Sequence, residues 1–271
     1  MNILTPKKTD FLIAEQPYYR TIEHEVDVFQ AAFQQKVPVL LKGPTGCGKT
    51  RFVSYMAYQL GLPLITVSCH EDLTTSDLIG RYLFKGDETI WSDGPMAAAV
   101  RMGGILYLDE IVEARKDTIV AIHPLTDHRR NLSMDKLASV LQAPPEFMLV
   151  VSYNPGYQSL LKELKPSTRQ RFVSLMFDYP PLDAEIEIIQ KESGIDEHIA
   201  NRLAKIAQKI RNLTDRGLEE GVSTRLLVYA AKLITQGVSP KIACDVAFSQ
   251  TLTDDVAIRE TIQQLILDFF R

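Results

Sequence analysis

A glycine-rich segment that ends in a lysine and a threonine is the part of the sequence most suited to chemistry. It fits the spacing G-x-x-x-x-G-K-[ST], with an apolar run before it and a helix-like run after it. Glycines let backbone N–H groups surround phosphate oxygens, and a helix that begins at the lysine directs its positive end to the same anion. The segment predicts a nucleotide phosphate site made of Gly43, Pro44, Thr45, Gly46, Cys47, Gly48, Lys49 and Thr50.

Three side chains of this segment have distinct expected roles. Lys49 should reach the β- and γ-phosphates of ATP, and the Thr50 hydroxyl should bind Mg²⁺. Cys47 is open to two interpretations. A helix N-terminus lowers the pKa of a thiol, which would suit a redox sensor. The alternative, which we favour, is a small residue tolerated where only its backbone matters.

An acidic pair follows a second apolar run, in "ILYLDE", about 60 residues after the lysine. A buried strand there would deliver Asp109 to the Mg²⁺ shell. Glu110 would then orient and deprotonate the water that attacks the terminal phosphate. The pair is therefore predicted to make the site hydrolytic.

Four further polar residues are candidates for the same reaction. Asn154 ends another apolar run and would hold the attacking water or the γ-phosphate, although Asn before Pro is also common in turns. Arg169 and Arg171 precede a further strand, and a guanidinium suits the charge of a transferring phosphoryl group. Arg225 begins a later helix, where it would contact phosphate or remain an exposed helix charge.

The elements that must position these residues can be read from hydrophobic patterns. Helices are expected at 23–36 and 49–61, and strands at 37–42, 63–69, 104–110, 147–155 and 172–181. Strands that alternate with helices indicate a parallel sheet covered on both faces. After Pro180-Pro181 every patterned stretch is helical. The predicted fold is an α/β core over 1–181 with a five-stranded parallel sheet, followed by a smaller all-helical subdomain over 182–271.

Composition limits the function classes. The 271 residues carry a formal net charge of −4 and a sequence pI near 5.8, which argues against a general electrostatic grip on nucleic acid. The three cysteines form neither a disulfide framework nor a zinc pattern. No signal-peptide pattern and no apolar run of about 20 residues is present. We expect a cytoplasmic protein without nucleic-acid or membrane partners.

The set of residues resembles that of an AAA+ ATPase: a phosphate loop, an Asp-Glu strand, a sensor Asn, an arginine finger and a helical lid with a sensor Arg. Two stretches resemble the MoxR group. One, at about 78–95 within "LIGRYLFKGDETIWSDGPMAAAVRMGG", is similar to its helix-2 insertion. The other, at about 127–146, is similar to the hairpin before its sensor strand. This resemblance implies a P-loop AAA+ core and lid.

Longer strings resemble the CbbQ/NirQ/NorQ/GvpN subfamily, and CbbQ members most. These are "CHEDLTTSDLIGRY", "YLDEIVEARKDT", "IHPLTDHRR" and "SYNPGYQSLLKELKPSTRQRF". The resemblance implies a homo-hexameric, Mg²⁺-dependent ATPase that works with a von Willebrand factor A adaptor similar to CbbO. It also implies Rubisco as the client, from which inhibitory sugar phosphates are released. The alternative is the same mechanism in nitric oxide reductase maturation or gas vesicle assembly.

Some residues of this set have more than one possible role. Both Arg169 and Arg171 suit the arginine finger, and Arg171 is preferred because it directly precedes Phe172. Tyr107, in the strand before Asp109, departs from the family pattern and is expected to be harmless. Aromatic and apolar residues of the insertion either transmit force to a partner or pack on their own domain; they are Tyr82, Leu83, Phe84 and Trp91.

Two other function classes compete with a remodelling ATPase. A DNA-handling motor of this class predicts basic pore residues and usually a nucleic-acid module, which this acidic chain does not offer. An assembly protein would bind nucleotide without needing turnover. The presence of Glu110 and Arg171 favours turnover over binding alone.

Overall fold

The computed structural model describes residues 3–155, 164–214 and 217–270. Part of the family-like string before Arg171, residues 156–163, lies outside them. The chain forms two compact units. The first contains Met1–Pro17, Glu23–Gly43 and Lys49–Phe177, and the second contains Tyr18–Ile22, Pro44–Gly48 and Asp178–Arg271. The turn of the glycine-rich loop, Pro44–Gly48, therefore belongs to the same unit as the C-terminal residues.

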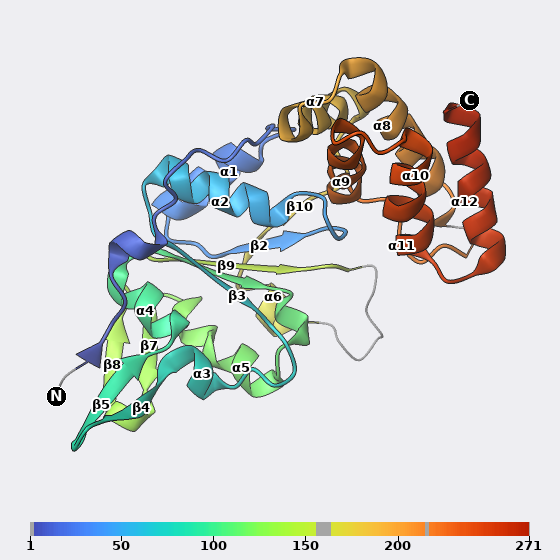
Figure 1. Cartoon of the computed structure of the whole chain (residues 1–271). Coiled ribbons are helices and arrows are strands. Elements are labelled where there is room, and N and C mark those ends of the chain that lie inside the picture. Colours follow the sequence, from blue (N-terminus) through green and yellow to red (C-terminus); the bar gives the residue numbers. More distant parts are fainter. Residues whose placement is uncertain (1–2, 156–163, 215–216, 271) are drawn as a thin grey trace. The chain divides into compact units, whose positions relative to one another are not determined.

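A five-stranded parallel sheet forms the centre of the first unit (Figure 1). Its strands are β2 (Val39–Lys42), β3 (Leu64–Ser68), β6 (Ile105–Asp109), β9 (Met148–Tyr153) and β10 (Val173–Met176). Their order is β10-β2-β9-β6-β3, and each adjacent pair is parallel. The predicted five-stranded parallel sheet is confirmed. Because β2, β9 and β6 are neighbours, their carboxyl ends lie together, where open α/β sheets bind ligands.

Helices cover both faces of this sheet (Figure 1). They are α1 (Glu25–Gln34) and α2 (Lys49–Leu60) on one face and α4 (Pro95–Met102) on the other. Phe29 of α1 and Phe52 of α2 are fully buried and meet edge to face, with ring centroids 5.4 Å apart. The small residues of α4 let it pack closely on β3 and β6. Strands buried on both faces explain the continuous apolar runs in the sequence.

The segment that follows β3 builds a second small sheet. It contains α3 (Thr75–Ile79), β4 (Gly80–Lys85) and β5 (Glu88–Asp93), and β1 (Ile3–Leu4) pairs with β5. Trp91 is fully buried, and its ring meets that of Tyr82 edge to face at 5.1 Å. Phe84 is 86% exposed. Of the four residues considered for force transmission, Trp91 is therefore core packing.

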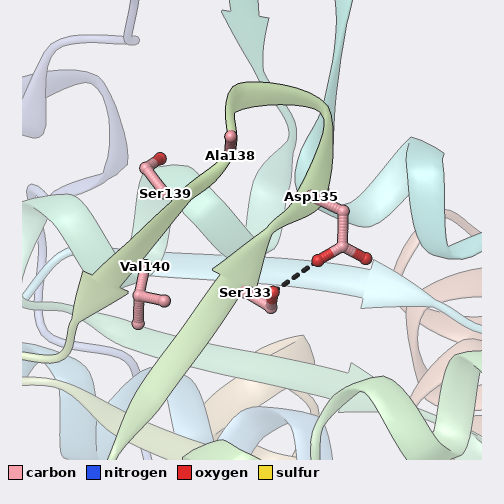
Figure 2. A pocket seen from close by; sticks show the side chains of 5 residues that line it. All are labelled: Ser133, Asp135, Ala138, Ser139 and Val140. Carbon is pink, nitrogen blue, oxygen red and sulfur yellow. Dashed lines mark hydrogen bonds between the residues drawn. The ribbon is translucent and has the colours of Figure 1, made fainter.

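A second hairpin, β7 (Asn131–Met134) with β8 (Ser139–Gln142), precedes β9. A pocket of about 370 Å³ lies on it (Figure 2). It is lined by Ser133, Asp135, Ala138, Ser139 and Val140. None of these is a candidate site residue, so this pocket is separate from the predicted chemistry. The other short elements are η1 (Lys8–Phe11), η2 (Ile111–Glu113), α5 (Lys116–Ala121), η3 (His123–Leu125), η4 (Asp135–Leu137) and α6 (Pro166–Arg169).

The second unit is helical over its described residues from 178 to 214 and from 217 to 270. Its elements are α7 (Leu182–Ser193), α8 (Glu197–Arg211), α9 (Thr224–Thr235), α10 (Pro240–Cys244), η6 (Asp245–Ser249), α11 (Gln250–Leu252) and α12 (Val256–Phe269). Apolar faces of these helices share one core. Within the described ranges of both units, no helix is long and apolar enough to cross a membrane.

Candidate active site

The glycine-rich loop runs from the end of β2 to the start of α2. Gly43 has φ +154°, and a Cβ atom built on it would lie 2.4 Å from the carbonyl oxygen of Phe177. Only glycine fits this backbone and this close approach. Lys49 and Thr50 are the first two residues of α2, as the motif requires.

Lys49 is nearly buried, with 6% of its surface exposed. Its Nζ donates a hydrogen bond to the carbonyl oxygen of Gly43 at 2.8 Å. A buried ammonium needs such partners, because leaving one unpaired is costly. The cation is therefore held at Gly43, the first residue of the loop.

Inside the second unit, which includes Pro44–Gly48, the loop turn meets a carboxylate. The backbone N–H of Thr45 donates to Oε1 of Glu220 at 3.1 Å. Arg225, at the second position of α9, is exposed, and a Cβ built on Gly46 would lie 3.4 Å from the Arg225 Cβ. The backbone N–H of Thr45 thus binds an anionic oxygen, and Arg225 lies near the same turn. Cys47 is buried, at 7% exposure.

Asp109 is the last residue of β6, and its two carboxylate oxygens have different surroundings. Oδ1 accepts hydrogen bonds from the Tyr107 hydroxyl at 2.7 Å and from the Ser152 hydroxyl. Oδ2 faces the Thr50 hydroxyl, with 3.5 Å between the oxygens. Cis oxygen ligands of octahedral Mg²⁺ lie about 3 Å apart, as bond lengths of about 2.0–2.1 Å require. The Thr50 and Asp109 oxygens are therefore hard ligands of the kind that magnesium prefers, and their separation is about 0.5 Å wider than a bound ion requires.

Glu110 follows in a left-handed backbone conformation, with φ +53°. Its N–H donates to the Ser152 hydroxyl at 3.2 Å. Burial raises the pKa of the Glu110 carboxyl, the Lys49 ammonium acts against this shift, and the Asp109 charge adds to it. A carboxylate with a raised pKa is a stronger base, which suits proton abstraction from water.

Asn154 directly follows β9 and is 6% exposed. A hydrogen bond from its backbone N–H lowers the pKa of Glu110 and so opposes the effect of burial. Since β9 lies between β2 and β6, Asn154 emerges between the carboxyl ends of these two strands. Its location is consistent with the expected role beside Glu110.

Arg169 ends α6, and Arg171 lies two residues later. The Arg171 guanidinium lies 3.6 Å from Oδ2 of Asp127. Its Nε is buried and has no hydrogen-bond partner among the described residues. No described residue forms an ion pair with Arg169 within the same unit. The Arg171 guanidinium therefore lies beside a carboxylate of its own unit.

Sequence reasoning missed two residues of this cluster, Tyr107 and Ser152. Tyr107 was expected to be harmless, but its hydroxyl is bound to Asp109. The signal was present, because residues two apart on a strand share a face and Tyr107 precedes Asp109 by two. Ser152 likewise precedes Asn154 by two residues, so these two share a face of β9. Its contacts with β6, however, depend on how the strands pair, which the sequence does not give.

Together, the parallel sheet, the loop at the end of β2 and the acidic pair at the end of β6 define a nucleotide-binding ATPase of the AAA class. The AAA domain (dynein-related subfamily) family matches residues 38–172. Among solved structures, a putative ATPase from Cytophaga hutchinsonii aligns with TM-score 0.51 at 16% identity, over 93% of this chain and 91% of that one. A RuvB mutant from Thermotoga maritima aligns with TM-score 0.56 at 18% identity, over 97% and 73%. These identities support the fold alone.

Sequence relatives narrow the class. The CbbQ/NirQ/NorQ C-terminal family matches residues 185–269. Protein CbbQ of Hydrogenophilus thermoluteolus is 52% identical, over 94% of this chain and 96% of that protein. The denitrification regulatory protein NirQ of Pseudomonas aeruginosa is 56% identical (92% and 96%), and protein NorQ of Paracoccus denitrificans is 55% identical (94% and 95%). The chain belongs to the MoxR-type CbbQ/NirQ/NorQ family of AAA+ ATPases, which confirms the resemblance.

Proposed function

We propose that this protein is a Mg²⁺-dependent ATPase that uses ATP hydrolysis to remodel a partner enzyme. The observation that carries the proposal is the convergence of four side chains at the carboxyl ends of β2 and β6. Thr50 and Asp109 bring hard oxygen ligands within 3.5 Å of each other. Glu110 lies close enough to Lys49 for the ammonium to affect its pKa.

These four side chains, together with Asn154 and Arg225, each have a task in the proposed reaction. Lys49 binds the β- and γ-phosphate oxygens, and the loop N–H groups hold the same anion. Thr50 and Asp109 would hold Mg²⁺, which neutralises charge that develops on the phosphates. Glu110 takes a proton from the attacking water, and Asn154 orients that water. Arg225 contacts the phosphates.

The complete site needs a second copy of the chain. We infer a homo-hexamer in which one subunit supplies an arginine finger, preferably Arg171, to its neighbour. Membership of the AAA+ class supports oligomeric assembly. A finger contributed between subunits makes hydrolysis depend on the ring and lets the ring respond to the γ-phosphate.

The client is the finer part of the proposal. We propose Rubisco, reached in the cytoplasm through a von Willebrand factor A adaptor similar to CbbO, with release of inhibitory sugar phosphates as the outcome. Similarity to protein CbbQ supports this client. Similarity to the denitrification regulatory protein NirQ and to NorQ supports nitric oxide reductase maturation equally well. We therefore retain that role as the alternative, and gas vesicle assembly as a third one.

A stalled variant separates these clients. Tagged Glu110→Gln should bind ATP without hydrolysing it, and so retain its partners. It is expressed in the source organism and purified with ATP, and the proteins that co-purify are identified by mass spectrometry. Lys49→Ala, purified in the same way, is the control that should not reach the ATP state. Capture of an adaptor with Rubisco subunits supports the activase role, whereas capture of nitric oxide reductase or gas vesicle proteins replaces it.

A further inference from the structure

A compact group of polar side chains lies at the carboxyl ends of β6 and β9, beside the predicted magnesium ligands. Tyr107 and Ser152 are both fully buried. The rest of β6 before Asp109 is apolar and buried as well. Two hydroxyl groups in such a place are costly unless they are hydrogen-bonded, and phenylalanine or alanine would serve for packing.

Strand register explains how these hydroxyls come together. β6 and β9 are adjacent and parallel, with Leu108 paired to Val151. The next residues along the two strands, Asp109 and Ser152, therefore lie alongside each other. Tyr107 shares a face of β6 with Asp109, because strand side chains alternate.

The two oxygens of the Asp109 carboxylate have different hydrogen-bond partners. Tyr107 and Ser152 both donate to Oδ1, which leaves Oδ2 toward Thr50. The Tyr107 hydroxyl also lies 3.5 Å from the Thr50 hydroxyl. A carboxylate held in this way offers a cation one oxygen from a fixed direction.

Ser152 also reaches the neighbouring acid. Its hydroxyl oxygen accepts the N–H of Glu110 while its proton is donated to Asp109. Glu110 occupies the left-handed region, which non-glycine residues enter only when their surroundings hold them there. One serine therefore connects the backbone of the predicted base to the side chain of the predicted metal ligand.

We propose that Tyr107 and Ser152 are positioning residues of this ATPase: both orient Asp109 so that Oδ2 binds Mg²⁺ beside Thr50, and Ser152 also fixes the backbone of Glu110. The inference rests on the proposed function, since it assumes a Mg²⁺–nucleotide complex.

The two residues have separable consequences. Tyr107→Phe removes one bond to Asp109 and leaves Glu110 untouched, so it should weaken Mg²⁺ binding and spare kcat at saturating Mg²⁺. Ser152→Ala removes the bond to Asp109 and the one from Glu110, so it should weaken Mg²⁺ binding and also lower kcat. Loss of a bond that orients a metal ligand typically costs about 10- to 100-fold in metal affinity.

The test measures the dissociation constant of a fluorescent ADP analogue (mant-ADP) with Mg²⁺ and with EDTA. The ratio of the two constants reports metal coupling without any turnover. Tyr107→Phe and Ser152→Ala should each reduce the wild-type coupling about 10-fold, with the EDTA constant unchanged. Tyr153→Phe and Ser174→Ala remove the same hydroxyl groups from β9 and β10 at positions outside this cluster, so both should keep the wild-type ratio.

The outcomes are distinct. Wild-type coupling in both variants overturns the inference, as does equal weakening with Mg²⁺ and with EDTA. An absence of Mg²⁺ coupling in the wild type instead contradicts the proposed function. Thermal unfolding of each variant checks that it is folded, and if one variant does not fold, the other decides the outcome.

Discussion

Gly43 shows how strictly a single residue of the phosphate loop is determined. Its φ is +154°, and an added Cβ would lie 2.4 Å from the backbone carbonyl oxygen of Phe177. Backbone cannot move aside as a flexible side chain can. At Gly43 the start of the loop therefore packs directly against the backbone of the segment after β10.

Gly43→Ala should therefore destabilise the first unit by about 3 kcal/mol, at the upper end of the cost of backbone strain. Gly61→Ala is the matched control, because Gly61 also has positive φ (+63°) but open space above its Cα. That substitution should cost about 1 kcal/mol. Urea unfolding of the two variants provides the comparison, and equal losses would show that the contact with Phe177 is unimportant.

At this scale the sequence predicts some residues better than others. The glycine loop could be located because its spacing and both flanking runs are local features. Tyr107 was misjudged because a tyrosine in a buried strand is usually packing, and its bond to Asp109 depends on which face both share. Ser152 could not be found, since its link to Glu110 crosses between strands that are about 40 residues apart in the chain.

Between elements, a buried ion pair fastens three helices of the second unit. Glu185 of α7 is fully buried and accepts two hydrogen bonds from Arg211 of α8, at 2.7 and 2.9 Å. It also accepts one from Thr224 of α9 at 2.7 Å. Arg211 further donates to the carbonyl oxygen of Val222 and stacks on Tyr179, with 4.0 Å to the ring centroid. Both charged members of this network are therefore supported by more than one contact.

Glu185→Gln should destabilise the protein by about 3 kcal/mol, because it leaves the Arg211 charge buried without its partner. Glu187→Gln, two residues along the same helix, is the matched control. Glu187 pairs with Arg20 at 3.1 Å, but both side chains are nearly half exposed. An exposed pair is worth about 0–1 kcal/mol. Thermal unfolding of both variants decides the matter, and similar shifts would contradict the buried network.

The sequence predicted those elements well for which the hydrophobic pattern and the length of the run indicate the same kind of structure. Four of the five strands were expected within two residues of their observed ends, because buried parallel strands read as apolar runs between breakers. Residues 172–181 were expected to be a strand throughout, but β10 ends at Met176, where the chain turns past Gly43. Every patterned stretch after Pro180-Pro181 was expected to be helical, and the π-helical form of η6 within that region is something that side-chain periodicity does not reveal.

For the whole molecule, the proposed ring predicts that Arg171 acts in a neighbouring site. Lys49→Ala subunits lack a working nucleotide site but carry Arg171. Arg171→Ala subunits lack the arginine but keep a working nucleotide site. When equal amounts are mixed before assembly, about a quarter of the interfaces regain both parts. ATPase activity should then reach about a quarter of the wild-type value, since the two residues act across one heterologous interface.

The same mixture made with Arg169→Ala in place of Arg171→Ala tests the other candidate finger. If Arg171 is the finger, Arg169→Ala alone should keep most of the wild-type activity. If Lys49→Ala subunits restore ATPase activity only in the mixture with Arg169→Ala, then Arg169 and not Arg171 is the arginine finger. Activity no higher than the sum of the separate proteins in both mixtures would rule out a finger supplied by the neighbour.

The central claim is that this chain hydrolyses ATP with Glu110 as the base, and steady-state phosphate release tests it most directly. Wild type, Glu110→Gln and the exposed control Glu146→Gln are compared at saturating Mg²⁺ and ATP, with binding of a fluorescent ATP analogue measured in parallel. The account predicts that Glu110→Gln binds nucleotide as tightly as wild type and loses about 10²- to 10⁴-fold in kcat, while Glu146→Gln does not change. Equal phosphate release from wild type and Glu110→Gln would contradict it.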